Sequence, residues 1–213
     1  MRQFRIISFV FICCALSAHA SLIFSQPGGG TTTTFATGST CSSGASSGTD
    51  AGFNITTTGA SCFPYSANWN LDDNGGWSSF ALIGDNSDTT VIKIDLGGLF
   101  SSVGGFMNYD IFGGVLSGTH PFIAAIAADG TTVLETDDLF LSGPISTLGG
   151  LNAGAFRGIS RPSNDIRFFE FGGSFAALHD LTLVATITPE PSSLALFAAG
   201  GVALFAMRRR ARG

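Results

Sequence analysis

Two tryptophans flank a short polar segment, Trp69-Asn70-Leu71-Asp72-Asp73-Asn74-Gly75-Gly76-Trp77, which holds the densest set of side chains able to bind a ligand. Indole rings present flat apolar faces that can stack on sugar rings, so Trp69 and Trp77 are candidate glycan-binding residues. Asp72, Asp73 and Asn74 carry oxygen atoms of the kind that calcium prefers, which makes this turn a candidate calcium site. Two alternatives stay open. Asp-Asn-Gly is ordinary turn sequence, and Trp77 precedes an apolar stretch in which it would be a core residue.

The residues that could support hydrolysis are scattered and incomplete. Gly44-Ala45-Ser46-Ser47-Gly48 matches the Gly-x-Ser-x-Gly pattern of a nucleophile elbow, but its surroundings lack the strand and the helix that an elbow needs. His179 precedes Asp180, and such a pair can orient a general base, yet no activated serine or cysteine accompanies it. Turn and strand-edge roles fit His120 and His179 better. The sequence therefore predicts no catalytic residue and no enzyme, and a secreted hydrolase is the third of three functional alternatives.

Cys41 and Cys62 are the cysteines outside the first 20 residues. In an oxidising compartment such a pair favours a disulfide, which would close a loop of about twenty residues and stabilise the fold by roughly 3 kcal/mol in the chain-entropy model. A zinc site is the alternative, but neither a Cys-x-x-Cys motif nor a nearby histidine completes one. We expect the disulfide, and no cofactor apart from calcium.

Both ends of the chain have the composition of targeting segments. Arg2 and Arg5 precede an apolar run from Ile6 to Leu16 and the small-x-small sequence Ala18-His19-Ala20, so residues 1–20 are predicted to be a secretory signal peptide. Residues 192–207 predict an apolar helix of about 16 residues and roughly 24 Å, shorter than the roughly 20 residues that a bilayer core prefers. The arginine cluster that follows should stay cytoplasmic, which places the upstream chain outside.

The order of these C-terminal features resembles a known sorting signal. Pro189-Glu190-Pro191-Ser192-Ser193, an apolar helix and a closing arginine cluster are similar to the PEP-CTERM signal of exported proteins in Gram-negative bacteria that make extracellular polysaccharide. The resemblance covers residues 188–212. It implies that an exosortase, a membrane transpeptidase that cuts near the motif, recognises Pro189, Glu190 and Pro191. Arg208, Arg209 and Arg210 would close the signal, and the helix would be a temporary tether.

The body between the two targeting segments is acidic. Residues 21–188 contain fourteen acidic and four basic side chains, a net charge of −10, although the whole chain has a formal charge of −5. Such a surface repels phosphates, and no basic stripe exists to bind them, so the sequence argues against a nucleic-acid partner. The body would tolerate cations and neutral glycans.

Alternating and β-branched segments predict an all-β body. Asp129-Gly130 is expected to form a primed turn between strands at Phe122–Ala127 and Thr131–Glu135. Gly97-Gly98 is expected to end the strand that begins at Val91. The other expected strands are Thr31–Thr37, Phe53–Thr58, Val91–Leu96, Phe106–Phe112, Ala155–Ile159, Ile166–Phe171 and Leu181–Ile187. Short strands separated by frequent turns favour a single antiparallel, jelly-roll-like β-sandwich.

Four regions follow from these segments: a signal peptide (1–20), a Gly/Ser/Thr-rich lead-in with early strands (21–60), the β-sandwich body (61–188) and the sorting signal with its transmembrane helix (189–213). The strand Val91–Leu96 closed by Gly97-Gly98, the Phe-rich middle and His179-Asp180-Leu181-Thr182-Leu183 resemble the β-sandwiches of PEP-CTERM cargo and galactose-binding-like jelly rolls. That second resemblance transfers no binding residue.

The first functional hypothesis is a non-enzymatic protein of the cell envelope or extracellular matrix, sorted by an exosortase and associated with exopolysaccharide and biofilm. The alternative is a carbohydrate-binding β-sandwich module that uses Trp69 and Trp77. Expected partners are the Sec machinery, signal peptidase, the exosortase-type transpeptidase, the membrane through the C-terminal helix, and exopolysaccharide. We expect export, anchoring at the inner membrane by the helix, and then a place on the cell surface or outside the cell.

Overall fold

The computed structural model describes residues 20–35, 46–58, 65–66, 69–78, 81–83, 89–116 and 118–186. Within these ranges all regular structure is strand and every ladder is antiparallel, so the prediction of an all-β, antiparallel protein is confirmed. The same ranges contain no helix long and apolar enough to cross a membrane. Residues 1–19 of the predicted signal peptide, Cys41, Cys62 and the whole sorting signal lie outside the described residues.

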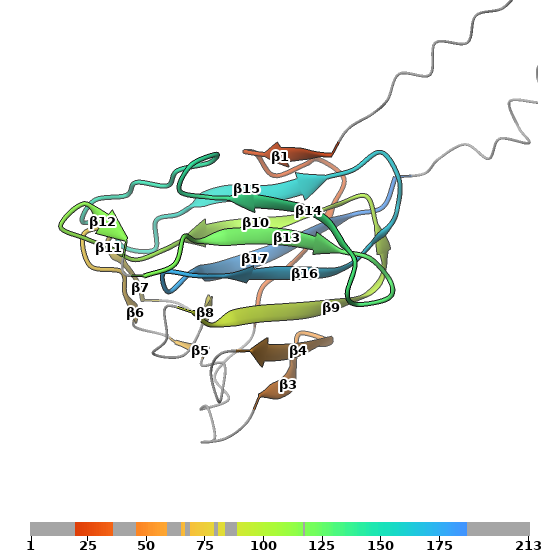
Figure 1. Cartoon of the computed structure of the whole chain (residues 1–213), viewed down its shortest axis with the longest axis horizontal. Coiled ribbons are helices and arrows are strands. Elements are labelled where there is room, and N and C mark those ends of the chain that lie inside the picture. Colours follow the sequence, from red (N-terminus) through yellow and green to blue (C-terminus); the bar gives the residue numbers. More distant parts are fainter. Residues whose placement is uncertain are drawn as a thin grey trace, which may run out of the picture.

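The first large sheet has seven strands, with β10 and β17 at its centre (Figure 1). Its order is β1 (Ser21–Ile23), β15 (Ala155–Ser160), β10 (Ser102–Asn108), β17 (Ala177–Val184), β8 (Ala81–Ile83) and β5 (Tyr65–Ser66), while β2 (Thr31–Thr33) pairs with the second half of β17.

The second large sheet has six strands, and two short hairpins complete the described fold. The six are β14 (Val133–Asp138), β13 (Phe122–Ile126), β16 (Ile166–Gly172), β9 (Val91–Phe100), β4 (Phe53–Thr58) and β3 (Ser47–Asp50). The hairpins pair β6 (Trp69–Asn70) with β7 (Gly76–Trp77) and β11 (Ile111–Phe112) with β12 (Val115–Leu116).

The two large sheets share one hydrophobic core, which makes the arrangement sandwich-like. Alternate residues along each strand face the same side, so one row of each strand turns inward and becomes buried. Each fully buried aliphatic or aromatic side chain of this kind contributes roughly 1.5–3 kcal/mol. The core includes Val103, Met107, Ile159, Leu178 and Leu181 from the seven-stranded sheet and Ile92, Ile94, Ile123, Phe169 and Phe171 from the six-stranded sheet.

The N-terminal third of the body belongs to both sheets. β1 pairs with β15 and β2 with β17 in one sheet, while β4 pairs with β9 in the other. The early strands expected near Thr31 and at Phe53–Thr58 are therefore present. Through these pairings, the described strands between residues 21 and 58 form part of the two large sheets.

Gly97 and Gly98 do not end a strand, contrary to the expectation from sequence, because β9 continues through them to Phe100. Phe100 pairs with Ile166, and the register shifts between Ile166 and Phe168, as it does at a β-bulge. Gly97 has a φ of +73°, a backbone conformation that glycine adopts without strain. The glycines therefore redirect the strand rather than end it.

The hairpin predicted between β13 and β14 is present, but its turn is not the primed turn expected from Asp-Gly. Gly130 has a φ of +74° and Asp129 does not share this left-handed conformation. The Gly130 N–H donates to the Ala127 carbonyl at 3.1 Å, which closes a turn one position earlier. Asp129 instead accepts hydrogen bonds from the backbone N–H groups of Thr131 and Thr132.

Acid is expected to remove the stability that Asp129 supplies to this turn. Hydrogen bonds from the Thr132 hydroxyl and from the Thr132 and Thr131 backbone lower the pKa of Asp129 from 3.8 to about 2. A carboxyl group whose pKa is lower in the folded state stabilises the fold above its unfolded pKa and loses that contribution as the pH falls through the folded value. Between about pH 5 and about pH 2, the wild type should therefore lose more stability in urea unfolding than Asp129→Ala. Equal losses would contradict this role.

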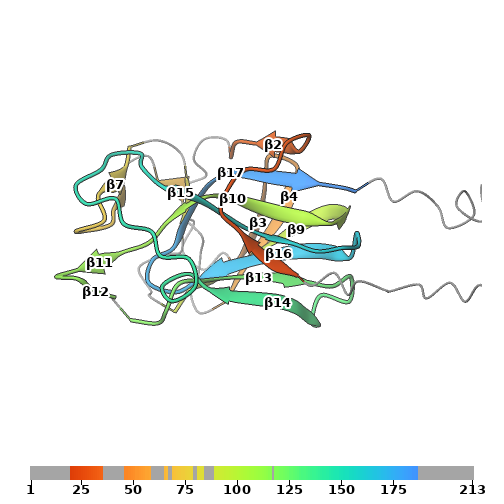
Figure 2. The same cartoon turned by 90° about the horizontal axis from the view of Figure 1, so that it is seen from above.

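The body has two distinct ends along the strand direction. Figures 1 and 2 place the hairpins β6–β7 and β11–β12 at one end, and the start of β1 and the end of β17 at the other. The two limits of the described body, near residues 20 and 186, therefore lie at the same end, opposite to the hairpin that carries Trp77.

Candidate binding site around Trp77

Trp77 closes the hairpin β6–β7 at the end of the sandwich remote from residue 186. Its side chain is only 3% exposed and packs with Leu71, Ala81, Ile83 and Ala177 in a second, smaller core. The indole therefore offers no open face to a sugar ring. Its surroundings are those of a core residue, the alternative role considered for Trp77 from the sequence. The backbone of Trp69 pairs with that of Trp77, while the Trp69 side chain lies outside the described residues.

A buried polar network holds the turn of this hairpin. The Asn74 side-chain amide donates to Asn108 Oδ1 at 2.6 Å and to the carbonyls of Tyr109 and Ile145 at 3.0 and 3.2 Å. The Thr147 N–H donates back to Asn74 Oδ1 at 2.7 Å. Asn74 and Asn108 are both fully buried. One asparagine thus joins the turn to the end of β10 and to the loop after residue 145.

The same network interrupts the strand that was expected over Phe106–Phe112. The Asn108 amide donates to the Asn74 carbonyl and to Thr147 Oγ1 at 3.1 and 2.9 Å, and β10 ends at this residue. The Asp110 N–H then donates to the Ser174 carbonyl at 2.8 Å, outside the sheet ladders. The chain resumes as a separate hairpin, β11–β12.

The loop of residues 147–154 closes over the β6–β7 hairpin. The Gly76 N–H donates to the Gly150 carbonyl at 2.9 Å, and the Asn152 N–H donates to the Gly76 carbonyl at 2.7 Å. A Cβ atom at Gly75 would lie 1.8 Å from the Gly150 carbonyl oxygen, so only glycine permits this approach. Gly75-Gly76 is a typical turn sequence, but here it also permits the close contact with the backbone at Gly150.

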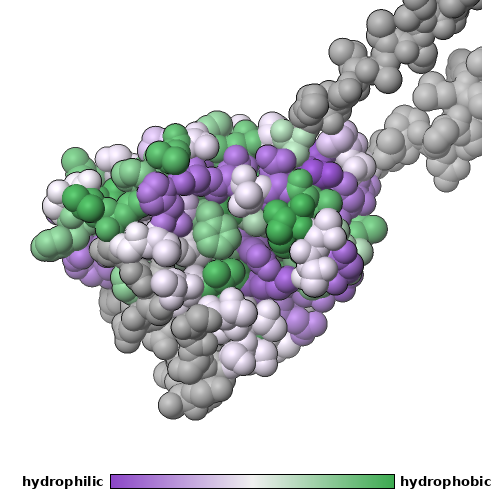
Figure 3. Space-filling view, viewed as in Figure 1, coloured by the Kyte–Doolittle hydropathy of each residue, from purple (hydrophilic) through white to green (hydrophobic). Residues whose placement is uncertain are grey.

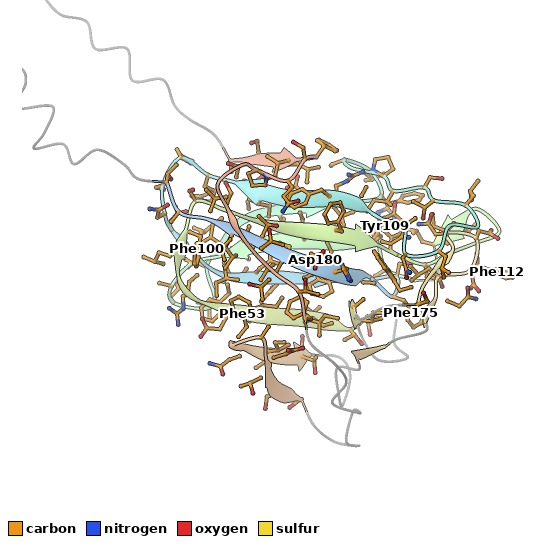
Figure 4. The ribbon with its side chains drawn as sticks, turned by 180° about the vertical axis from the view of Figure 1, so that it is seen from behind. Phe53, Phe100, Tyr109, Phe112, Phe175 and Asp180 are labelled. Atoms are coloured by element: carbon orange, nitrogen blue, oxygen red, sulfur yellow. The ribbon has the colours of Figure 1, made fainter. Side chains whose placement is uncertain are left out.

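His179 stacks on the indole of Trp77 from the neighbouring strand β17. The two ring centroids are 5.5 Å apart and the rings are nearly parallel, at 7°. His179 Nδ1 lies 3.1 Å from Asp180 Oδ2, so the His-Asp pair noted in the sequence is in contact. The Thr34 hydroxyl donates to Asp180 Oδ1 at 2.6 Å. Figure 4 shows Asp180 on β17, in the middle of the seven-stranded sheet.

Two hollows are lined in part by Trp77. The larger, of about 480 Å³, is lined by Asn70, Asp72, Trp77, Ser78 and the loop at residues 149–151. The smaller, of about 310 Å³, is lined by Trp77, Phe106, Asn152, Gly154, His179 and Asp180. Asn152 accepts a hydrogen bond from the Ser78 N–H at 2.6 Å, which links the residues that border the two hollows.

The three residues of the candidate calcium turn differ in exposure and in hydrogen bonding. Asp72 and Asp73 are exposed, and Asp73 Oδ2 accepts a hydrogen bond from the Gly114 N–H at 3.3 Å. Asn74 is buried, and its side-chain oxygen already accepts from Thr147. Among the described residues, no three His, Cys, Asp or Glu side chains are grouped closely enough to share a metal ion.

The structure does not bring together the residues considered for hydrolysis. His120 lies beside Asp138, with Nδ1 2.6 Å from Asp138 Oδ2, at the edge of the six-stranded sheet, whereas His179 belongs to the other sheet. Ser46 is followed directly by the strand β3 rather than by the helix of a nucleophile elbow.

Apolar side chains are exposed at the same end of the molecule as the larger hollow. Figure 3 shows hydrophobic surface there, at the end where Figure 1 places β11 and β12. Phe112, Val115, Leu148 and Leu151 are between 67% and 74% exposed. Leu151 also lines the larger hollow, which therefore has an apolar rim.

Comparison with known proteins identifies the C-terminal segment. The family model of the PEP-CTERM protein-sorting motif matches residues 188–210. The comparisons with curated proteins and with solved structures found no match. The resemblance of Pro189-Glu190-Pro191, the apolar segment and the arginine cluster to this signal is thereby confirmed. The chain carries a PEP-CTERM protein-sorting motif, which supports a protein sorted by an exosortase system.

Proposed function

We propose that this protein is exported, processed by an exosortase-type transpeptidase and placed in the cell envelope or extracellular matrix as a non-enzymatic component associated with exopolysaccharide. The match of residues 188–210 to the sorting motif is the observation that carries the proposal. The signal-peptide pattern of residues 1–20 supports export through the Sec machinery and removal of the leader by signal peptidase. The apolar segment at residues 192–207 supports a short membrane tether, with Arg208, Arg209 and Arg210 on the inner side.

The position of the body relative to its C-terminal limit fits this route. β17 ends at Val184, at the end of the body opposite to the Trp77 hairpin (Figures 1 and 2). A tether that follows residue 186 would place the Trp77 hairpin and the larger hollow at the end of the body remote from the membrane, towards the extracellular polymer. The body itself would be a single jelly-roll-like β-sandwich, which the core shared by its two sheets supports.

A carbohydrate-binding module is the second candidate function, and the hollows beside Trp77 favour it. They combine aromatic rings with carboxylate, amide and imidazole groups, the mixture that orients a polar ligand on an apolar floor. The acidic body accepts neutral glycans more readily than anionic ones. The buried Trp77 indole would support such a site by stacking beneath His179 rather than by contacting the sugar, and Trp69 remains a predicted platform.

Replacing Glu190 with alanine, or deleting residues 208–213, is expected to leave uncut protein in the membrane fraction. The first change alters the motif that the transpeptidase would recognise, and the second removes the charges that would hold the helix end inside. Cell fractionation followed by intact-mass measurement checks both. Glu135→Ala, which removes a carboxylate from the folded body, is the matched control and should be processed normally. Normal export and processing of both tail variants would refute the proposal.

A further inference from the structure

Three aromatic rings lie side by side across the outer face of the seven-stranded sheet. Phe106 on β10 is in register with Phe156 on β15 and with His179 on β17. Neighbouring Met107 points into the shared core, so Phe106 points to the opposite, outer side. The Phe106 and Phe156 rings meet edge to face at 5.8 Å. With Trp77 stacked on His179, the row extends over four rings, of which Phe106 and His179 are partly exposed.

A β-bulge places a carboxylate next to this row. Gly105 pairs with Leu181 and Phe106 pairs with His179, so Asp180 is the extra residue of β17. Its φ is +56°, a conformation that is unusual for any residue except glycine, asparagine and aspartate. Bulges redirect side chains, and strained backbone of this kind is concentrated at functional sites.

The Asp180 carboxylate is fixed but still has acceptor capacity. Oδ1 accepts from the Thr34 hydroxyl and Oδ2 faces His179 Nδ1. Each carboxylate oxygen offers two lone-pair directions, so both can accept a further hydrogen bond from a ligand. The Asp180 side chain is 25% exposed and that of His179 is 22% exposed, so a ligand in the smaller hollow can reach both.

The chemistry of the smaller hollow selects a class of ligand. An apolar aromatic floor beside a fixed hydrogen-bond acceptor suits a ring that has C–H groups on its face and hydroxyl groups on its rim. The volume of about 310 Å³ suits a ligand of one or two such rings. The acidic body, with a net charge of −10, disfavours anionic sugars.

We propose that the smaller hollow binds a neutral sugar residue, with one ring face on Phe106 and its hydroxyl groups hydrogen-bonded to Asp180 and His179. This inference rests on the carbohydrate-binding function proposed above. It locates that function on the sheet face at the Asp180 bulge, rather than on the tryptophans of the β6–β7 hairpin.

Saturation-transfer NMR and calorimetry with maltose, cellobiose and lactose test the proposal on the exported protein. At least one of these disaccharides should bind the wild type, and Asp180→Asn and Phe106→Leu should each weaken that binding about tenfold or more, as expected for the loss of one charged hydrogen bond or one ring contact. Asparagine tolerates the φ of residue 180, so the first variant should fold. Leu99→Ala, at an exposed position on the other sheet, is the control and should bind as tightly as the wild type.

Several outcomes would overturn the proposal. The proposal would be refuted if the wild type bound none of the three disaccharides. That result would leave the sorting function untouched, because sorting is measured from the processed C-terminus. Loss of binding in Trp69→Ala with full binding in Asp180→Asn would keep the carbohydrate function and refute this site. Binding of tetramethylammonium in place of the disaccharides would refute the sugar class. If Asp180→Asn melts early, Asp180→Gly repeats the test, because glycine adopts positive φ without strain.

Discussion

Asn74→Asp is expected to destabilise the body by about 4 kcal/mol at neutral pH. The substitution keeps the size of the side chain but replaces an amide donor with a carboxylate oxygen. That oxygen would face Asn108 Oδ1 and the carbonyls of Tyr109 and Ile145, which now accept from Asn74. The Thr147 N–H would still donate to the other carboxylate oxygen, but one backbone donor does not compensate a buried negative charge opposite three acceptors.

Urea unfolding at two pH values checks this prediction. Burial should raise the pKa of the new carboxyl group above its unfolded value near 4, so the destabilisation should grow as the pH rises above about 4 and shrink below it. Asn70→Asp is the matched control, because Asn70 is exposed on the same hairpin and should cost less than about 1 kcal/mol. A loss at residue 74 as small as that at residue 70 would show that the buried network does not hold the turn.

Arg157→Met is expected to cost roughly 3 kcal/mol of stability, because it leaves backbone carbonyls unpaired inside the protein. Arg157 is 7% exposed and donates to the carbonyls of Gly143 and Pro144 at 2.7 and 2.6 Å and to that of Phe156 at 2.8 Å. Burial lowers the pKa of Arg157, yet the guanidinium keeps its charge at every pH at which the protein is studied. The Phe24 ring packs over the guanidinium group, with Arg157 Cζ 4.9 Å from the ring centroid.

Arg157→Lys separates the effect of charge from that of geometry. Lysine keeps the charge but lacks the planar fork that reaches two adjacent carbonyls. We expect this variant to recover only part of the loss, as measured by thermal and urea unfolding. Arg167→Met, on the outer face of the six-stranded sheet, is the control and should cost about 1 kcal/mol or less, since its ion pair with Asp95 is partly exposed. Full recovery by lysine would refute the role of the fork.

Local sequence patterns predicted part of the strands, because strand formation there follows from alternation and turn residues. The stretch Val91–Leu96 and the pair of segments around Asp129 both form strands near their expected limits. The limits and bulges of the strands depend on pairing across the sheet, which cannot be predicted from the sequence of one strand alone. For this reason Gly97 became a bulge rather than a strand end.

The candidate site was only partly predictable for the same reason. The Trp69–Trp77 segment borders both hollows through Trp77, but the burial of Trp77 depends on Ala177 and His179, about one hundred residues later in the chain. The partners of Asn74 lie 34 and 73 residues away, at Asn108 and Thr147, and no local pattern marks them. The Asp180 bulge arises only when β17 pairs with β10.

The C-terminal segment was recognisable from sequence because a sorting signal is read as a short linear pattern. Its three parts follow each other within residues 188–210, where the family model also matches. Sorting therefore depends on contiguous residues, whereas the proposed sugar binding would depend on residues brought together by folding. The two functions can be tested independently for this reason.

The mass of the mature protein's C-terminus tests the central claim most directly. We predict that protein recovered from outside the inner membrane ends close to Pro189-Glu190-Pro191 and lacks residues 194–207. Mature protein that still contains the apolar segment and the arginine cluster would contradict processing by an exosortase-type enzyme.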